Sequence, residues 1–237
     1  KQLLMVGGMD KYYQVARCFR DEDLRADRQP EFTQVDMEMS FVDQEDVLTH
    51  LEKLFHAVFA EVMGRELDYV FPRLTWQESM DRYGCDKPDL RFGMEIADVT
   101  DIAAECGFSV FRAVAERGGM VRALNCKGCG EKFTRSTIET LTAHALGYGA
   151  KGMAWILIHD NGEINSILQK YFTPPQWQAL LERLGAENGD FILFCADNFA
   201  TVCRTLGGLR LEVGDMLGLR PKDDFRFCFV TDFPQFE

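Results

Sequence analysis

The sequence predicts an α+β fold, and three observations carry this prediction. Residues 34–41 alternate polar and apolar side chains, which is the period of a strand that is buried on one face. Residues 47–62 repeat apolar side chains at the 3.6-residue period of a helix. From residue 93 onward, short strand and helix patterns alternate with hairpin-like turns, which favours a two-layer α+β module over a doubly wound sheet.

The residue pattern in the first part of the sequence predicts a long hairpin followed by helices. Residues 11–20 and 31–42 read as two strands around a charged loop. The next helix is expected to cover a sheet. Two helices have capping-box start signals and glycine stop signals: Asp43 with Asp46 and a stop at Gly64, and Thr75 with Glu78 and a stop near Gly84. The segment CDKPDLRF after them reads as a loop.

A change to shorter elements with more glycine predicts a domain boundary near residue 93. Beyond it, the pattern predicts strands near 108–115, 119–125, 153–159, 163–168 and 190–196. It predicts helices near 98–106, 134–147, 174–184 and 198–206. The turns HDNGEI and AERGGMV are read as hairpin connections.

Composition narrows the class of protein. The chain has 237 residues, 46% of them hydrophobic, and a net charge of −12, so it shows no overall basic footprint for nucleic acid. Its longest apolar runs, MAWILI and FILFCA, fall far short of the roughly 20 residues of a membrane span. Eight scattered cysteines fit reduced thiols. We therefore expect a cytoplasmic protein with no membrane contact. Both ends look cut, which predicts a piece of a longer protein.

The hairpin is the strongest candidate for a binding site. If Cys18 faces Gln34, one face holds Arg20, Phe32, Gln34 and Asp36, with only small side chains between them. In this register Ala16 faces Asp36 and Arg20 faces Phe32. An arginine fork suits phosphate or carboxylate, a phenyl ring suits a flat base, and Gln with Asp suits an ammonium group. The set would accept a nucleotide joined to an amino acid; the alternative is a solvated hairpin whose charges serve solubility.

Other motifs give weaker signals. Cys126 and Cys129 have zinc-knuckle spacing, but the chain offers no second pair to complete four ligands, so we predict a turn and no metal site. The four histidines show no ligand spacing. No P-loop, dinucleotide-binding glycine motif or nucleophile elbow is present in the sequence.

The segment FRDEDLRADRQPEFTQVDMEMSF closely resembles motif 2 of the bacterial aspartyl-tRNA synthetases, which are class II enzymes. YGCDKPDLRF, GAKGMAWI and DFPQFE are similar to later landmarks of that family, in the same order. The resemblance implies that residues 1–92 are part of the class II antiparallel sheet with its helices. Residues 93–224 resemble the inserted GAD domain, and residues 225–237 would be a return strand into the catalytic domain.

The resemblance also implies roles for individual residues. Arg20 is similar to the arginine that holds the α-phosphate of ATP and the substrate carboxylate, and it is the candidate catalytic residue. Asp21, Glu22 and Gln29 would be further ATP contacts, and Phe32 would stack on adenine. Gln34 would bind near the ammonium group of aspartate. Asp36 and Lys1 would shape the aspartate pocket, and Lys1 would meet the side-chain carboxylate.

The implied function is that of an aspartate–tRNA ligase of protein biosynthesis. It activates aspartate with ATP and Mg²⁺ to aspartyl-adenylate, transfers the acyl group to tRNA and works as a homodimer. The anticodon-binding barrel, the motif 1 helix and the motif 3 arginine are absent from this sequence, so we expect this piece alone to be inactive, and a monomeric state is compatible with it. Two alternatives stay open: a recognition module for tRNA or protein built on the GAD-like part, and an inactive truncated paralogue.

Overall fold

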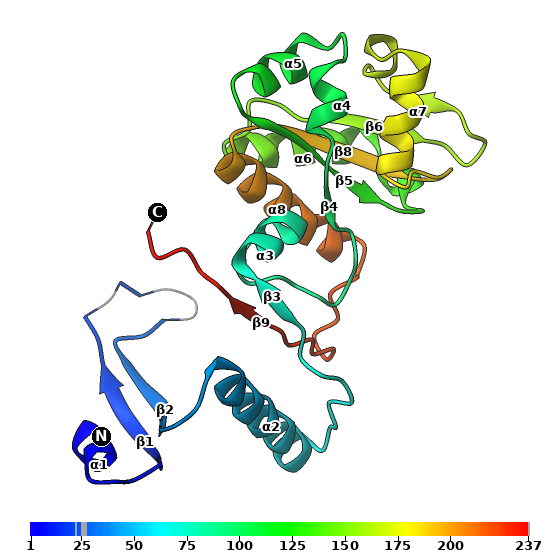
Figure 1. Ribbon diagram of the computed structural model, residues 1–237. Helices are drawn as coiled ribbons and strands as arrows, with labels where there is room; N and C mark the ends of the chain where they lie inside the picture. The colour runs from blue at the N-terminus through cyan, green and yellow to red at the C-terminus, as the bar shows by residue number, and fades with distance from the viewer. Residues whose placement is uncertain (22, 25–27, 237) are drawn as a thin grey trace. The chain divides into compact units, whose positions relative to one another are not determined.

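The computed structural model describes residues 1–21, 23–24 and 28–236, and it divides the chain into two compact units. The first unit is Lys1–Val70 and the second is Phe71–Glu237. Each is described here by itself (Figure 1).

An antiparallel two-stranded ribbon forms the centre of the first unit. Strands β1 (Lys11–Phe19) and β2 (Glu31–Met39) pair along their whole length, which confirms the predicted hairpin. A short helix, α1 (Gln2–Val6), precedes the ribbon, and α2 (Gln44–Met63) follows it.

The register of the hairpin differs from the predicted one by two residues. Cys18 pairs with Phe32, Ala16 with Gln34, and Gln14 with Asp36. The ladder ends where the backbone N–H of Arg20 donates to Pro30 O at 2.8 Å, since Pro30 has no N–H to return. Because the side-chain period of a strand is two, a shift of two residues leaves the same side chains on the same face. The predicted polar face is therefore retained, with Gln14 and not Ala16 opposite Asp36.

The prediction that the hairpin buries its apolar face is wrong for this chain. Large apolar side chains of this face are exposed: Tyr13, Val15, Phe19, Val35 and Met37. By contrast, Phe32 and Asp36 on the opposite face are half-buried. The physical reason is that the ribbon has two strands, and within the described residues of the first unit no further layer packs on it.

Helix α2 begins and ends as predicted, but within the first unit it does not cover a sheet. The Asp43 side chain accepts from the backbone of Glu45 and Asp46, and Gly64 ends the helix in the left-handed region at φ 61°. Phe59 is the one side chain that α2 buries. Its other apolar side chains, which include Val58 and Val62, stay in contact with solvent.

The second unit is built on a five-stranded sheet with strand order β4-β5-β8-β6-β7, in which every neighbouring pair is antiparallel. Its strands are β4 (Ile96–Asp98), β5 (Met120–Cys126), β6 (Ala154–Ile158), β7 (Ile164–Asn165) and β8 (Phe191–Asp197). A separate parallel pair joins β3 (Arg73–Thr75) to β9 (Phe229–Thr231).

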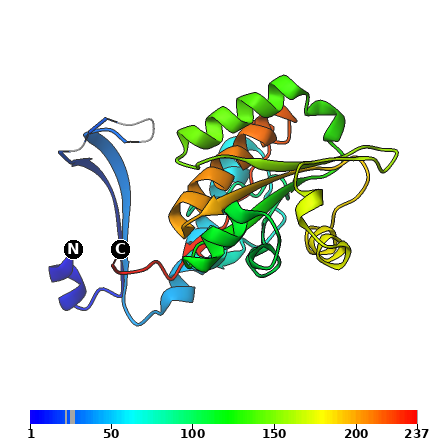
Figure 2. The ribbon, with the colours of Figure 1, turned by 90° about the horizontal axis from the view of Figure 1, so that it is seen from above.

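Helices cover both faces of the five-stranded sheet (Figures 1 and 2), so the predicted two-layer module is in fact three-layered. The helices of this unit are α3 (Trp76–Tyr83), α4 (Thr100–Ala104), α5 (Ser109–Glu116), α6 (Arg135–Gly147), α7 (Pro174–Arg183) and α8 (Phe199–Met216), with 3₁₀ turns η1 (Gly130–Lys132) and η2 (Gln169–Tyr171). On one face, Leu141 of α6 and Leu206 of α8 pack on Phe191 and its neighbours. On the other, Phe111 of α5 and Leu180 of α7 pack on Ile156 and its neighbours.

The two-layer prediction failed because one segment was misread. Residues 108–115 were predicted as a strand, but they form α5, which buries Phe111 and Val114 three positions apart on one helical face. AERGGMV consequently joins a helix to β5 and is not a hairpin turn. The turn HDNGEI does connect the antiparallel strands β6 and β7. The sequence pattern also missed the three-residue strand β4 and the last ten residues of α8.

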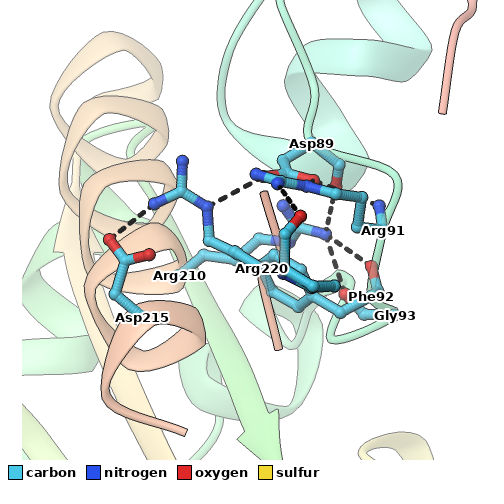
Figure 3. Close-up of polar contacts among 8 residues, drawn as sticks. Asp89, Arg91, Phe92, Gly93, Arg210, Asp215 and Arg220 are labelled. Carbon is cyan, nitrogen blue, oxygen red and sulfur yellow. Dashed lines mark hydrogen bonds and ion pairs between the residues drawn. The ribbon is translucent and has the colours of Figure 1, made fainter. Parts of the chain in front are cut away.

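The buried side chain of Arg210, on helix α8, binds the loop before β4 through hydrogen bonds (Figure 3). Arg210 is 1% exposed, and its guanidinium lies 4.0 Å from the ring centre of Phe92 and 4.9 Å from that of Tyr83. It donates at 2.8–3.0 Å to four backbone carbonyls of the loop, those of Asp89, Phe92, Gly93 and Met94. The polar loop is thus held by carbonyl acceptors and aromatic faces, without a carboxylate on Arg210.

This packing explains why residues 71–92 belong to the second compact unit. Helix α3 ends at Gly84, whose φ is 72° and whose added Cβ would lie 2.4 Å from Cys203 O of α8. Such close backbone contact ties residues 71–92 to the second unit. The assignment of 93–224 as an inserted domain stays a prediction.

None of the helices in the described part of the chain combines the length and the apolar character needed to cross a bilayer.

Candidate functional site

The polar face of the hairpin brings a lysine between two carboxylates. Lys1 lies immediately before α1, and its Nζ is 2.9 Å from Asp36 Oδ1 and 2.6 Å from Glu38 Oε1. Asp36 and Glu38 are two residues apart on β2, so the strand period places both on one face. Gln14 of β1 donates to the second oxygen of Asp36 at 3.1 Å. The predicted pair Lys1 and Asp36 is therefore in direct contact.

These contacts shift the proton affinities of the pair in opposite directions. Hydrogen bonds from Lys1 to Asp36 and then to Glu38 raise the pKa of the Lys1 ammonium above its usual value. Hydrogen bonds from Lys1 and then from Gln14 hold the pKa of Asp36 below its usual range. Both groups are therefore charged at neutral pH, and the cluster holds one positive and two negative charges. Two of the three Lys1 donors are used, which leaves one for a further acceptor.

The second pair on this face is Arg20 with Phe32. The Arg20 guanidinium carbon lies 5.3 Å from the centre of the Phe32 ring, which is cation–π distance. Arg20 is the first residue after β1 and is fixed by its backbone bond to Pro30. A planar cation thus sits beside a half-buried aromatic ring, as expected for a site that takes a phosphate next to a flat base.

Small side chains separate the two pairs. Ala16 lies opposite Gln34 in the ladder. The Cys18 thiol donates to Gln34 Oε1 at 3.4 Å and orients that amide. The floor between the pairs is therefore shallow, and the amide of Gln34 stands between the carboxylate end and the guanidinium end.

Two of the remaining predicted residues, Asp21 and Gln29, lie between strands β1 and β2. Asp21 and Gln29 are exposed. Glu22 lies outside the described residues. The structure does not bring Asp21 or Gln29 into contact with the face described above, and their predicted role as ATP contacts stays a prediction.

Sequence reasoning missed two members of this face, Gln14 and Glu38. Glu38 shares the parity of Gln34 and Asp36, so strand alternation alone was sufficient to include it. Gln14 was missed because the assumed register placed Ala16 opposite Asp36.

No three His, Cys, Asp or Glu side chains of the described residues cluster as metal ligands. At the zinc-like motif, Cys126 is buried in the core and burial raises the pKa of its thiol. Cys129 donates to Lys127 O at 3.0 Å. Burial favours the protonated thiol of Cys126, which is a poor metal ligand.

Comparison with known proteins connects this face to a family. The model of the family "tRNA synthetases class II (D, K and N)" matches residues 1–237. The chain is 50% identical over 237 residues to the aspartate–tRNA(Asp/Asn) ligase of Persephonella marina and 52% identical over 237 residues to that of Moorella thermoacetica. Each match covers 100% of this chain and 39% of the relative. The ligase of Symbiobacterium thermophilum is 50% identical over the whole chain and 40% of its own length. The chain thus spans well under half the length of the curated relatives that it matches.

Proposed function

Because the chain belongs to the class II tRNA synthetases of the D, K and N group, we propose that it is the part of an aspartate–tRNA ligase that carries half of the amino-acid activation site. In the whole protein, ATP and aspartate form aspartyl-adenylate with release of pyrophosphate, and the acyl group passes to tRNA. The observation that carries the proposal is the face on which Arg20 and Phe32 stand at one end and Lys1 and Asp36 at the other.

On this face, the protein positions charge and does not form a covalent intermediate. Arg20 neutralises the phosphate that aspartate attacks and so stabilises the charge that develops there. The Arg20 guanidinium covers the Phe32 ring in this structure. If adenine stacks on that ring, the Arg20 guanidinium leaves the ring and contacts the phosphate of ATP. Binding of the base is thereby coupled to the positioning of the arginine charge.

At the other end, the cluster of Lys1, Asp36 and Glu38 recognises aspartate. Its net negative charge favours the substrate ammonium group near Asp36, and the third donor of Lys1 meets the side-chain carboxylate. When asparagine replaces aspartate, the third donor of Lys1 faces a neutral amide and has no charged partner. The loss of this charge partner at a polar site is a strong basis on which the protein rejects asparagine.

Mg²⁺ fits this proposal as a companion of ATP. The described residues hold no three-ligand carboxylate cluster, and Mg²⁺ commonly binds through nucleotide phosphates, water and one or two carboxylates. It supplies charge neutralisation on the phosphates when bound. The residues of this chain bind and orient; they do not need to form a dedicated metal cage.

We further propose that residues 93–224 are an insertion in the catalytic domain. The support is topological, since β3 and β9 pair directly although the five-stranded sheet lies between them in the sequence. Homodimer formation, tRNA charging and a cytoplasmic location are proposed for the whole protein. The relatives' names include both tRNA(Asp) and tRNA(Asn), and we propose the same pair of acceptors here.

The test is aspartate-dependent exchange of labelled pyrophosphate into ATP, run on the uncut protein with Arg20→Ala and Arg17→Ala variants. Arg17 is the matched control, because it lies on β1 three residues before Arg20, on the opposite face of the hairpin, and its guanidinium is 3.2 Å from the Glu31 carboxylate. We expect Arg20→Ala to lower exchange by about 10²–10³-fold, the usual cost of removing one charge-stabilising donor. Arg17→Ala should stay near the unaltered rate. Equal rates for the two variants would refute the assignment of Arg20.

A further inference from the structure

A groove of the second unit runs along helix α5. It has a volume of about 420 Å³, which is in the range of pockets that hold small ligands. Helix α5 lies on the face of the five-stranded sheet that also carries α7 (Figure 1). Most of the residues that line the groove are apolar, for example Val114 of α5, Ala154 of β6 and Phe194 of β8. Such a lining favours a ligand with an apolar body.

The groove joins buried core residues to apolar residues that are open to water. Phe111, Val114 and Phe194 are buried, and the ring centres of the two phenylalanines are 5.9 Å apart. Val110 and Ile167 line the same groove but are 53% and 61% exposed. A ligand that covers these two side chains removes apolar surface from water, which is favourable.

Two cations line the groove where α5 ends. Arg117 is the residue that ends α5, and Lys151 comes shortly before β6; both also line an adjoining hollow of about 180 Å³. Among the described residues, Arg117 makes no ion pair, and its Nε donates to Ala113 O at 2.9 Å. Lys151 Nζ lies 3.5 Å from Asp197, but the lysine side chain is 80% exposed and its ammonium has three donors. Both cations can therefore donate to an anion.

The charge balance at this end favours an anion with a single charge. Two cations and the carboxylate of Asp197 leave a net charge of +1 there, in a chain whose net charge is −12. A carboxylate brings one negative charge, whereas a phosphate ester brings about 1.5 to 2. The carboxylate therefore matches this end of the groove better than a phosphate does.

The length of the groove sets the size of the apolar body. Val110 and Arg117 are seven residues apart along α5, which corresponds to about 10 Å of helix. With carbon–carbon bonds of about 1.5 Å, an extended chain of about eight carbon atoms spans that distance. We propose that the groove binds a medium-chain aliphatic carboxylate, whose chain lies on Val114 and Phe194 and whose carboxylate lies between Arg117 and Lys151. The proposal does not rest on the activation face, because all of its residues belong to the second unit.

The test is isothermal titration calorimetry of this chain with octanoate, hexanoate, octanol and octylamine. We expect saturable binding of octanoate, and a dissociation constant about 15-fold higher for hexanoate, because each buried methylene contributes about fourfold. Octanol should bind more weakly than octanoate, and octylamine should bind most weakly of the eight-carbon ligands. The proposal is overturned if octanoate shows no saturable binding, or if octanol or octylamine binds as tightly as octanoate.

Two arginine variants locate the carboxylate. Arg117→Gln removes a cation of the groove. Arg112→Gln is the control, because Arg112 is exposed on the same helix, does not line the groove and pairs with Glu116 at 3.8 Å. We expect Arg117→Gln to weaken octanoate binding about fivefold and to leave octanol binding unchanged. Arg112→Gln should change neither. Equal octanoate affinities of the two variants would overturn the proposal.

Two alanine variants locate the aliphatic chain. Ala113 lines the groove, whereas Ala115 lies on the same helix outside it, and both are half-buried. Ala113→Leu should fill the groove and weaken octanoate binding about tenfold or more, and Ala115→Leu should not. Urea unfolding followed by tryptophan fluorescence shows whether each variant is folded. Unchanged octanoate binding by a folded Ala113→Leu protein would overturn the proposal, and the arginine variants keep it refutable if that protein is unfolded.

Discussion

Arg210→Met is predicted to destabilise the second unit by about 3 kcal/mol. The change keeps most of the apolar stem but removes the donor of four backbone carbonyls. Asp89, Phe92 and Met94 are half-buried, whereas Gly93 is exposed and its carbonyl can turn to water. A buried acceptor left unsatisfied costs about 1–3 kcal/mol, so the three half-buried carbonyls give at least about 3 kcal/mol if none finds another donor. Release of the buried charge from its desolvated position offsets part of this loss. Methionine can also pack between Tyr83 and Phe92, where the guanidinium lay.

The assay is urea unfolding followed by tryptophan fluorescence. All three tryptophans, Trp76, Trp155 and Trp177, lie in the second unit, so the signal reports on that unit alone. Arg204→Met is the control, since Arg204 lies on the same helix but is exposed, and it should change stability by no more than about 0.5 kcal/mol. A loss for Arg210→Met below about 1 kcal/mol, or equal to that of the control, would refute the role given to the guanidinium.

Three other changes test separate features of the second unit. Gly84→Ala should lower the free energy of unfolding by about 3 kcal/mol, because the backbone at this position is left-handed and the added Cβ would clash with Cys203 O. Gly218→Ala is the control, since Gly218 has φ 71° but open space around it, and it should cost about 1–2 kcal/mol. Equal urea midpoints for the two variants would contradict the close approach at Gly84. Hydrogen bonds first from Arg91 and then from Arg220 hold the pKa of the Asp89 carboxyl below its usual range. The stability that ionised Asp89 contributes to the folded protein is therefore fully present above about pH 4, and it is lost as the pH falls through the lowered pKa of the folded state. The stability difference between the unaltered protein and Asp89→Asn should therefore shrink in acid, and a constant difference would count against it. Glu212 raises the pKa of Tyr148 to about 12, so Tyr148→Phe should remove the latest step from the alkaline tyrosinate titration, and an unchanged curve would argue against that hydrogen bond.

The sequence predicted most elements of the fold because their signals are local. Capping boxes at Asp43 and Thr75 marked helix starts, and the structure contains both. The misreading at 108–115 has a physical cause, since Phe111 and Val114 suit either a strand or a helix until packing against the sheet decides. The number of layers depends on whether this segment is a strand or a helix, so the two-layer prediction failed together with the strand prediction.

The candidate site was partly predictable for a similar reason. A register shift by an even number of residues does not change which side chains share a face of a strand pair. The face of Gln34 and Asp36 was therefore predicted correctly, although each of the two residues was assigned the wrong partner. The contact between Lys1 and Asp36 spans 35 residues, and no local pattern in the sequence contains such information. It came only from the family resemblance, which also could not anticipate that the hairpin exposes its apolar side in this chain.

The pairing of β3 with β9 has a consequence for the order in which the protein is made. Thr231 donates to Leu74 O although the two residues are 157 positions apart, and the two strands run parallel. Loop closure over such a distance is unfavourable unless the chain between the strands has already become compact. During translation, β3 leaves the ribosome long before β9 has been synthesised. The five-stranded sheet between them must therefore fold first and carry the two ends together, so that completion of the β3–β9 pair reports that the intervening unit has folded.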